Sequence, residues 1–445
     1  MCSRTAGEMK AAWSGAAAPP TRRAWWAVAV FTVAALLSYT DRQILSLLVD
    51  PIRHDLGISD TQVSLLQGAA FAVLYCLFGL PLGRSADVLP RRLVIMVGVA
   101  LWSAGTAACG LATSFGALFA SRLCVGIGEA ALAPAALSMI ADYFAPDRRS
   151  TAIGVFLAGM VVGSGASVAF GGLLLRAVQT NLFVWIPGIS HLAPWREVLL
   201  ILGMGGIPIF LMMLSVPEPA RQGRTGDASS APPLVAVIAE FAHRRRTLAP
   251  LYLALAVSAI NDYALYAWTP AFLMRNLSWP ADAAGSALGI AGAICGIAGT
   301  LGGGIVADRF GSGGGVHGRL LVARAAAALA ITGGLVGVSS SAPALLVLFS
   351  LWVLASSMLG AIGIAVLQEL LPSQMRGVGT ALISFGNTIL GLGLGPTLVA
   401  LCTDYVYGDA HAVGLATTTV VLPVTLLTLL LFWRAARALR PAAAA

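Results

Sequence analysis

The chain has 445 residues, of which 58% are hydrophobic and only 10% are charged, and its formal net charge is +8. An ordinary soluble domain carries about 25% charged residues, so this chain has too few charged side chains to cover a soluble surface. The composition excludes a soluble enzyme, a nucleic-acid-binding protein and a disordered chain. It indicates a membrane protein that crosses the bilayer several times.

Long apolar runs follow one another along the sequence. A helix needs about 20 apolar residues to cross the hydrocarbon layer of a membrane, and the runs lack the alternation of membrane strands. The first run is too long for a secretory signal and has no cleavage site, so we expect it to be retained. We predict twelve membrane helices, over 24–49, 61–83, 92–112, 115–139, 150–176, 196–216, 249–274, 284–307, 319–339, 343–370, 377–403 and 412–433.

The longest polar connection covers residues 217–248 and separates two groups of six expected helices. We therefore predict an all-helical membrane protein with one six-helix bundle over 24–216 and a second over 249–434. Residues 1–23 and 435–445 would be a cytoplasmic segment and a cytoplasmic tail. The connection itself is either a plain linker or, over 234–246, an amphipathic helix on the membrane surface.

The basic residues indicate how the chain is oriented. With the N-terminus in the cytoplasm, 21 of the 27 Lys and Arg residues fall in cytoplasmic segments and four fall in outer segments. The other two, Arg42 and Arg122, lie inside expected helices. This asymmetry follows the positive-inside rule and favours an even number of helices with both termini in the cytoplasm. The Arg, Ala and Gly bias suggests a bacterial genome, hence an inner-membrane location.

Short segments repeat at equivalent places in the two halves. GRSAD (residues 83–87) follows the second expected helix, and GIVADR (304–309) follows the eighth. The fourth helix ends in DYFAPDRR (142–149) and the tenth in ELLPSQMR (369–376). The fifth and eleventh helices are both rich in glycine, which lets helices approach closely. Three matches in the same order indicate an internal repeat.

This arrangement of six plus six helices, with G-x-x-x-D-R segments after helices two and eight, resembles the major facilitator superfamily. The resemblance implies that these segments form a cytoplasmic latch between the halves. The latch residues would be Gly83, Asp87, Arg91, Arg92, Asp308 and Arg309. The first copy departs from the family pattern, since Val88 replaces a basic residue and Pro90 replaces a glycine, which points to a weaker latch in the first half.

A narrower resemblance is to the spinster family of lipid transporters. It rests on four segments: YTDR (39–42), RLCVGIGEA (122–130), WR (195–196) and WTPAFL (268–273). The Asp-Arg pair also occurs in organic-anion branches of the superfamily, so RLCVGIGEA is the more discriminating segment. The spinster resemblance alone implies an amphipathic lipid substrate, such as a lysophospholipid or a sphingoid lipid.

Four ionisable residues lie well inside expected helices: Asp41, Arg42, Arg122 and Glu129. A charge costs about 2.5–3.5 kcal/mol in the middle of a membrane helix unless it pairs or faces water. Arg122 and Glu129 are seven residues apart and so lie on one helix face. In the superfamily, helices one and four line the central cavity, which implies that all four charges surround one cavity wall. Their formal charges cancel, which permits two ion pairs.

We assign proton coupling mainly to Glu129 and secondly to Asp41, because burial and a nearby arginine have opposite effects on a carboxylate's proton affinity. We assign binding of an anionic headgroup to Arg122 and Arg42, since arginine stays charged and binds phosphate or carboxylate bidentately. In this scheme neutralisation of Glu129 frees Arg122 for the headgroup. The alternative is that these pairs are structural and hold helix one against helix four.

The second half offers further polar residues in the seventh helix. Asn261 and Tyr263 are assigned to substrate binding, near Asp262, Tyr266 and Trp268. Asn387 in the eleventh helix is a further candidate for the cavity wall. Aromatic residues at such places can equally belong to the core or to the membrane interface.

The sequence holds no HExxH, GxSxG or phosphate-loop segment, and its histidines and cysteines have no metal-ligand spacing. We therefore expect no enzymatic activity, no cofactor and no metal. The expected function is proton-coupled transport of an amphipathic lipid by alternating access; the alternative is transport of a small organic anion. The expected partners are that substrate, protons and the lipid bilayer, with no nucleic acid, and the protein is expected to be a monomer.

Overall fold

The computed structural model describes residues 21–183, 191–221, 241, 243–372 and 375–439. Within these ranges every regular element is a helix. Most of the expected terminal segments 1–23 and 435–445, namely residues 1–20 and 440–445, lies outside the described residues. So does most of the linker, residues 222–240 and 242.

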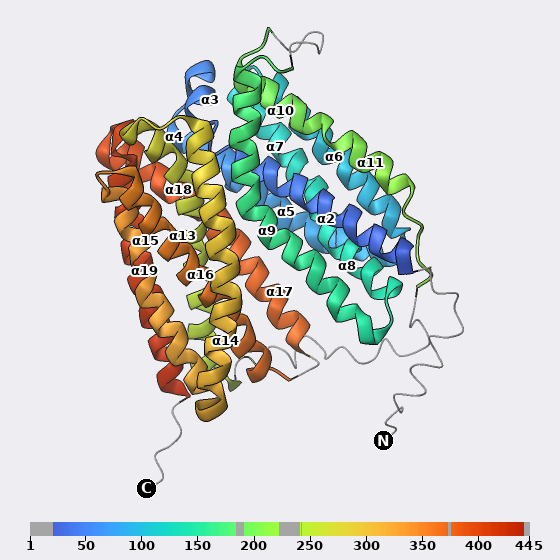
Figure 1. The fold of residues 1–445 in the computed structure, drawn as a ribbon, viewed down its shortest axis with the longest axis vertical. Helices are drawn as coiled ribbons and strands as arrows, with labels where there is room; N and C mark the ends of the chain where they lie inside the picture. The colour runs from blue at the N-terminus through green and yellow to red at the C-terminus, as the bar shows by residue number, and fades with distance from the viewer. Residues whose placement is uncertain (1–20, 184–190, 222–240, 242, 373–374, 440–445) are drawn as a thin grey trace.

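The first half of the molecule extends from α2 to α11 and is drawn from blue to green in Figure 1. Its helices are α2 (Thr21–Ile44), α3 (Val49–Leu56), α4 (Asp60–Gln67), α5 (Ala69–Val88), α6 (Arg91–Leu111), α7 (Phe115–Ala130), α8 (Leu132–Tyr143), α9 (Pro146–Gln179), α10 (Pro194–Met204) and α11 (Gly206–Leu214).

The second half extends from α13 to α19 and is drawn from yellow-green to red. Its elements are α13 (Arg245–Leu277), α14 (Ala281–Leu329), α15 (Thr332–Leu335), η2 (Val336–Val338), α16 (Ala342–Leu370), α17 (Arg376–Gly386), η4 (Asn387–Leu392), α18 (Gly393–Leu401), η5 (Cys402–Tyr407), η6 (Ala410–Ala412) and α19 (Val413–Ala438).

The described residues contain 11 helical segments long and apolar enough to cross a membrane. The helix α9 supplies the twelfth span, since it has 34 residues and its described part Gly165–Gln179 is apolar. Two spans lie within α14 and are separated at Gly315, where a φ of 56° interrupts the helix. The prediction of twelve helices in two bundles is therefore confirmed.

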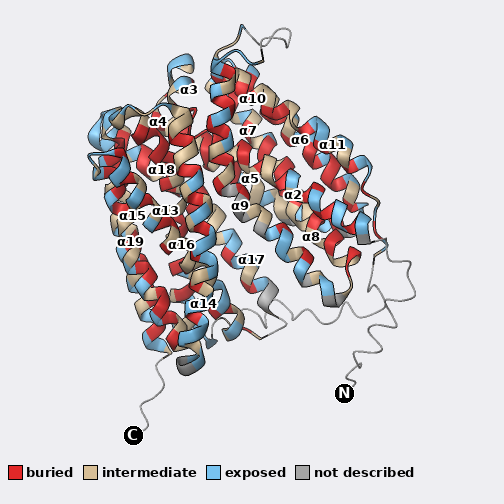
Figure 2. Ribbon diagram, in the orientation of Figure 1, coloured by how far each residue is buried: buried red, intermediate tan, exposed pale blue. Residues whose placement is uncertain are grey.

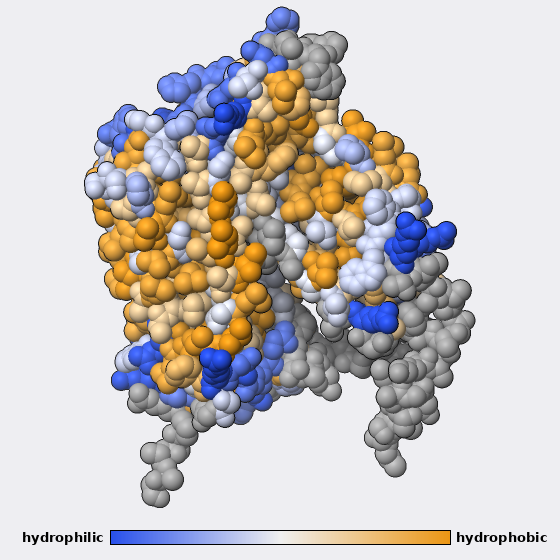
Figure 3. All heavy atoms as spheres, in the orientation of Figure 1, coloured by the Kyte–Doolittle hydropathy of each residue, from blue (hydrophilic) through white to orange (hydrophobic). Residues whose placement is uncertain are grey.

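Apolar side chains face outward around the middle of the molecule. Leu77, Ile294 and Leu301 are each 63% exposed, and Figure 3 shows an apolar band between hydrophilic ends. Buried residues instead gather where helices pack against each other (Figure 2). In water such a surface would be unfavourable, whereas in a bilayer it contacts the acyl chains.

Several spans are less regular than the apolar runs predict. The second span is divided into α4 and α5 at Gly68, where the other half approaches so closely that a Cβ would lie 2.2 Å from the Leu392 carbonyl oxygen. The fourth and sixth spans are divided as well, after Ala130 and at Gly205. The eleventh span contains two π-helical turns, η4 and η5. Such turns widen a helix locally and are frequent at functional sites.

The two halves meet at the end of the molecule where α3 and α4 lie, which we call the α3/α4 end. Figure 1 shows the ribbons diverging from there toward the far ends of α8 and α17. Glycines on α9 and α14 permit the contact between the halves: a Cβ on Gly289 would lie 2.5 Å from the Ala169 backbone nitrogen.

Candidate functional site

The last turns of α2 carry the polar residues from which the site is built. Ser38, Asp41 and Arg42 lie within the final seven residues of this helix. Neighbouring residues on a helix point about 100° apart, so Asp41 and Arg42 reach different partners. Each of them forms an ion pair with a residue of α7.

Arg42 pairs with Glu129. Its Nε and Nη2 atoms donate hydrogen bonds to Glu129 Oε2 over 3.0 and 2.6 Å, and Ser38 Oγ donates to the same oxygen over 2.5 Å. The second oxygen, Oε1, is buried and has no hydrogen-bond partner among the described residues. The side chain of Arg42 is 16% exposed and that of Glu129 is 0% exposed. The arginine is thus the member of the pair that solvent can reach.

Three aromatic rings surround the Arg42 guanidinium. Its central carbon lies 4.3 Å from the centroid of Phe71 and 5.3 Å from those of Tyr39 and Tyr75. The negative faces of such rings attract a cation. They help to hold the guanidinium beside Glu129.

Asp41 lies deeper, beside Arg122. The closest approach, from Arg122 Nη1 to Asp41 Oδ1, is 3.7 Å, which makes an ion pair without a hydrogen bond. Thr106 Oγ1 donates to the other Asp41 oxygen over 2.5 Å, and Arg122 Nε donates to the Leu66 carbonyl over 3.3 Å. Both charged residues are almost fully buried, at 2% and 1% exposed.

The pairing differs from the exchange that the sequence suggested. Glu129 is bonded to Arg42 of α2, not to Arg122 on its own helix, and Arg122 is instead beside Asp41. Within a helix, residues seven apart share a face but lie two turns apart, about 10 Å. In this conformation Glu129 and Arg122 are therefore not direct partners, and the predicted exchange between them would require a rearrangement.

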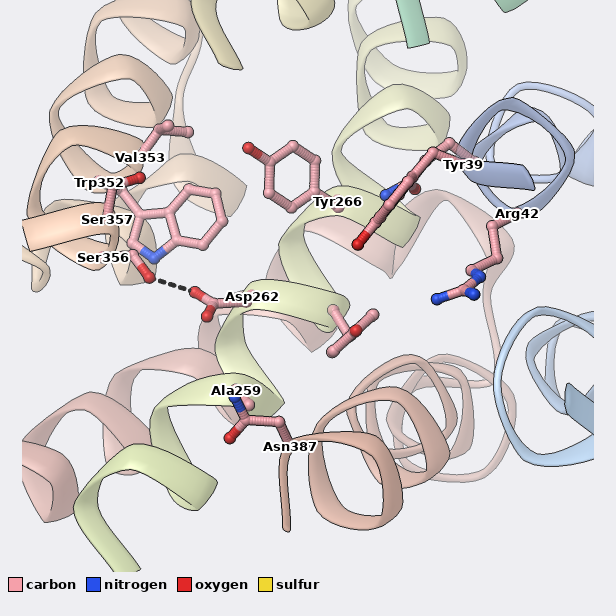
Figure 4. A pocket seen from close by; sticks show the side chains of 12 residues that line it. Tyr39, Arg42, Ala259, Asp262, Tyr266, Trp352, Val353, Ser356, Ser357 and Asn387 are labelled. Atoms are coloured by element: carbon pink, nitrogen blue, oxygen red, sulfur yellow. Dashed lines mark hydrogen bonds between the residues drawn. The ribbon is translucent and has the colours of Figure 1, made fainter. Parts of the chain in front are cut away.

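A cavity of about 290 Å³ lies between the halves beside Arg42 (Figure 4). The first half contributes Tyr39, Arg42 and Gln43 from α2. The second half contributes Ala259, Asp262, Tyr263 and Tyr266 from α13, Trp352, Val353, Ser356 and Ser357 from α16, and Asn387 from η4. A small adjoining cavity of about 30 Å³ shares Arg42, Gln43, Tyr263 and Tyr266 with it.

The structure separates the assigned residues into two layers. Arg42 and Tyr263 line the cavity, as does Asn387. Asp41, Arg122 and Glu129 are not among its lining residues and lie behind Arg42. The charges therefore do not all face the cavity, which corrects the expectation of one shared wall. Glu129 is nevertheless linked to the cavity, because it binds Arg42, which lines the cavity.

Asn261 does not reach the cavity. Its side chain is 4% exposed and donates a hydrogen bond to Thr425 Oγ1 of α19 over 2.8 Å, on the opposite side of α13. Asp262 is the neighbouring residue that does line the cavity, and it accepts a hydrogen bond from Ser356 Oγ over 2.5 Å. In this conformation Asn261 is therefore not part of the cavity wall, and its role in substrate binding stays a prediction.

Helical periodicity could have made this distinction. Residues 259, 262, 263 and 266 are spaced i, i+3, i+4 and i+7 and share one face of α13, and all four line the cavity. Asn261 falls off that face. Trp352 and Ser356, which lie opposite this face of α13, belong to α16. Nothing in the sequence indicates that they pack near α13.

At the α3/α4 end, three charged residues join the halves. Arg275, at the end of α13, donates to Asp50 of α3 and bidentately to Asp60 of α4, each over 2.8 Å. We call these three residues the Arg275 lock. Nearby, Asp404 of η5 accepts hydrogen bonds from the backbone nitrogen and the hydroxyl of Thr61, both over 2.7 Å. These contacts close the α3/α4 end in this conformation.

The expected latch residues of the first half contact that same half. Arg91 is buried, bonds Asp142 at the end of α8, and donates to Glu218 over 2.8 Å. The backbone nitrogen of Arg92 donates to the other oxygen of Glu218, also over 2.8 Å. Gly83 faces α8, with Pro134 3.9 Å from where its Cβ would be. The side chain of Asp87 lies outside the described residues.

The second half repeats this arrangement. Arg319 bonds Glu369 at the end of α16 and donates to Asp308 over 3.1 Å; Arg309 is exposed. Arg91–Asp142 and Arg319–Glu369 thus join equivalent places, the start of the third or ninth span and the end of the fourth or tenth. In this conformation Arg91, Arg92 and Asp308 thus make their polar contacts within their own half.

No group of His, Cys, Asp and Glu side chains in the described ranges could hold a metal ion. What the site does offer is a solvent-reachable cation, a buried carboxylate behind it and a second carboxylate across the cavity. Such a set can bind a charged headgroup and exchange a proton.

The sequence profile of the Major Facilitator Superfamily matches residues 31–396. A protein described as an MFS-type efflux pump in Mycolicibacterium smegmatis is 29% identical over 430 residues, which cover 93% of either chain. Protein spinster of Drosophila melanogaster is 30% identical over 201 residues, 45% of this chain and 31% of the fly protein. The D-galactonate transporter of Escherichia coli is 28% identical over 205 residues, 46% of this chain and 44% of that protein.

A solved structure supports the fold. A bacterial homologue of the human lysosomal transporter Spinster, in an inward-facing and unoccupied conformation, superposes with a TM-score of 0.79. It is 24% identical, and the match covers 93% of this chain and 97% of that one. The spinster resemblance found in the sequence is confirmed by these relatives.

Proposed function

The chain belongs to the major facilitator superfamily, and from this premise we propose a proton-coupled transporter that moves an amphipathic lipid across the membrane. The substrate would be a lysophospholipid or a sphingoid-type lipid, bound near the middle of the membrane and released by alternating access of the two halves. The lipid class rests on the spinster resemblance.

One observation carries the coupling mechanism: Arg42 lines the cavity and at the same time binds the buried carboxylate of Glu129. An anionic headgroup and the Glu129 carboxylate are competing partners for one guanidinium. When Glu129 takes up a proton, its attraction for Arg42 falls, and Arg42 can turn its donors to the headgroup. When the headgroup leaves, the ion pair re-forms and the proton is released.

Asp41 would act second in this scheme. It shares a buried layer with Arg122, and its Oδ1 atom has no hydrogen-bond partner among the described residues. A proton at that oxygen would loosen Arg122, which could then follow Arg42 toward the headgroup in a conformation where the layer opens. Asp41 therefore remains a proposed proton carrier and Arg122 a proposed second headgroup ligand.

A small organic anion is the alternative substrate, because Arg42 would bind a sugar acid as readily as a phosphate. The partial similarity to the D-galactonate transporter favours this alternative. A lysophospholipid is larger than a sugar acid and needs apolar side chains around its acyl chain. Transport measurements with each compound can therefore distinguish the two substrates.

The test uses purified protein in proteoliposomes with an imposed pH gradient. We expect a fluorescent lysophospholipid to move faster with the gradient than without it, and protein-free liposomes give the baseline. Galactonate uptake without lysophospholipid transport would replace the lipid by the organic anion. Gradient-independent movement of both would overturn proton coupling.

The remaining assignments complete the proposal. The protein would be a monomer in a bacterial inner membrane with both termini in the cytoplasm, so that the α3/α4 end faces outward. In the outward-open state the residues around Arg91 and Asp308 would form the cytoplasmic latch between the halves. That contact would replace the contacts within each half seen here.

A further inference from the structure

The proposed mechanism leaves one charged residue of the cavity without a role. Asp262 lies on α13, across the cavity from Arg42 (Figure 4). It accepts one hydrogen bond, from Ser356 Oγ to its Oδ1 atom over 2.5 Å. Among the described residues no Lys, Arg or His side chain forms an ion pair with it. A carboxylate in such a place needs either a proton or a cationic ligand.

Aromatic rings form the wall beside this carboxylate. Tyr266 of α13 and Trp352 of α16 both line the cavity, and their ring centroids lie 5.5 Å apart at an interplanar angle of 64°. Phe349 packs against both rings from behind, at 5.6 and 5.2 Å. Edge-packed rings of this kind are held in fixed orientations before any ligand arrives.

A carboxylate beside Tyr and Trp rings is the set of groups that recognises an organic ammonium ion. The carboxylate supplies charge, and the rings attract alkylammonium groups through their negative faces. A compact inorganic cation binds oxygen ligands and gains little from aromatic ring faces, so the aromatic wall favours an organic ammonium group. In Figure 4 the rings of Tyr266 and Trp352 lie on the same side of the cavity as Asp262.

We propose that Asp262, with Tyr266 and Trp352, is a binding subsite for the amine of an amphipathic substrate. The cavity then has two poles: Arg42 on the first half binds an anionic group, and Asp262 on the second half binds an ammonium group. A zwitterionic headgroup would bridge the two halves. This inference rests on the proposed function and makes it more specific, since it selects amine-bearing lipids over lipids that carry only negative charge.

The test compares two lipids with the same acyl chain, lysophosphatidylcholine and lysophosphatidylglycerol, which differ in the presence of the ammonium group. Binding is measured on purified protein by ligand-induced thermal stabilisation over a concentration series. We expect the wild-type protein to bind the choline lipid about tenfold or more tightly than the glycerol lipid. Asp262→Asn should remove this preference by weakening choline-lipid binding alone.

Two further variants control for folding and charge. Asp262→Glu keeps the charge and should keep the preference, at least in part. Glu197→Gln neutralises a carboxylate of α10 that does not line the cavity, and it should change neither affinity. If Asp262→Asn is poorly folded, Tyr266→Leu offers a second way to weaken the subsite. It should likewise lower affinity for the choline lipid and spare the glycerol lipid.

The outcomes separate this inference from the proposed function. Equal binding of both lipids by the wild-type protein, or a preference that survives Asp262→Asn, overturns the ammonium subsite while lipid binding stands. If Asp262→Asn keeps the preference but loses response to a pH gradient, Asp262 is a proton carrier instead. If neither lipid binds, the lipid assignment fails, and benzyltrimethylammonium against benzyl alcohol becomes the deciding pair: stabilisation by the amine that requires Asp262 supports the subsite, and its absence overturns it.

Discussion

Arg42 and Glu129 meet at a single oxygen atom. Both Arg42 donors and the Ser38 hydroxyl bond Glu129 Oε2, while Oε1 is buried without a hydrogen-bond partner among the described residues. A proton can therefore be added at Oε1 without first breaking a hydrogen bond. Addition would remove the negative charge that holds Arg42, and so would change the charge presented to the cavity.

Glu129→Gln should abolish transport driven by a pH gradient, because the amide keeps the shape of the protonated acid and cannot release a proton. We expect gradient-driven lysophospholipid flux to fall about tenfold or more, while exchange without a gradient continues. The measurement is flux into proteoliposomes with and without an imposed gradient. Glu197→Gln is the matched control and should behave like the wild-type protein; unchanged coupling in Glu129→Gln would exclude Glu129 as the proton carrier.

Arg42 and Arg122 should respond differently to substitution, since only Arg42 lines the cavity. Arg42→Gln is expected to weaken substrate binding about tenfold, or about 1.4 kcal/mol. Each variant also leaves a buried carboxylate without its ion-pair partner, Glu129 in Arg42→Gln and Asp41 in Arg122→Gln, a change that costs about 3–5 kcal/mol in buried pairs. Both variants should therefore lower the melting temperature of the purified protein, whereas Arg42→Gln alone should also weaken substrate binding in this conformation.

A second substitution checks the explanation for Arg122. Because Asp41→Asn removes the charge that Arg122→Gln strands, the double variant should melt at a higher temperature than Arg122→Gln alone. Melting curves of the two single variants and the double variant decide this. If Arg122→Gln melts like the wild-type protein and loses substrate binding, Arg122 is a headgroup ligand already in this conformation.

The fold and the charged residues inside the membrane helices could be predicted, because both depend only on which residue types follow one another along the chain. An apolar run of membrane length, or an arginine inside such a run, can be recognised without knowing which helices pack beside it. The close approach at Gly68 was not predictable, since the Leu392 carbonyl that lies beside it belongs to the other half. The π-helical turns of the eleventh span gave no separate signal either.

The ion pairs and the cavity wall depended on how helices are rotated against each other. Asp41 and Arg42 are adjacent in sequence, yet they bind different residues of α7, and the sequence did not show which. Asn261 and Asp262 are adjacent too; helical periodicity places them on different faces of α13, but only the packing of α13 against α19 shows which face meets the cavity. Residue type was therefore predictable at this site, whereas residue direction was not.

The Arg275 lock should hold the α3/α4 end closed. Arg275→Gln removes the charge that joins Asp50 and Asp60 across the halves, and it should shift the population toward a state open at that end. Spin labels at His54→Cys and His411→Cys, both exposed and on opposite halves, report this as a longer mean distance in a background without the native cysteines. Arg246→Gln, which changes an exposed arginine in the first turn of α13 away from the lock, is the control. An unchanged distance distribution in Arg275→Gln would show that packing, not charge, keeps this end closed.

The crossing of α9 and α14 gives a steric test of the same closed end. A Cβ on Gly289 would lie 2.5 Å from the Ala169 backbone nitrogen and 2.7 Å from the Gly165 carbonyl oxygen, whereas a Cβ on Gly302 of the same helix meets nothing within 4 Å. Both contacts at Gly289 are with backbone atoms that cannot rotate away, so Gly289→Val must push the halves apart. We expect Gly289→Val to lower the melting temperature and to slow transport, and Gly302→Val to leave both unchanged. Equal behaviour of the two variants would mean that α9 and α14 do not need this close approach, and that other contacts hold the halves together.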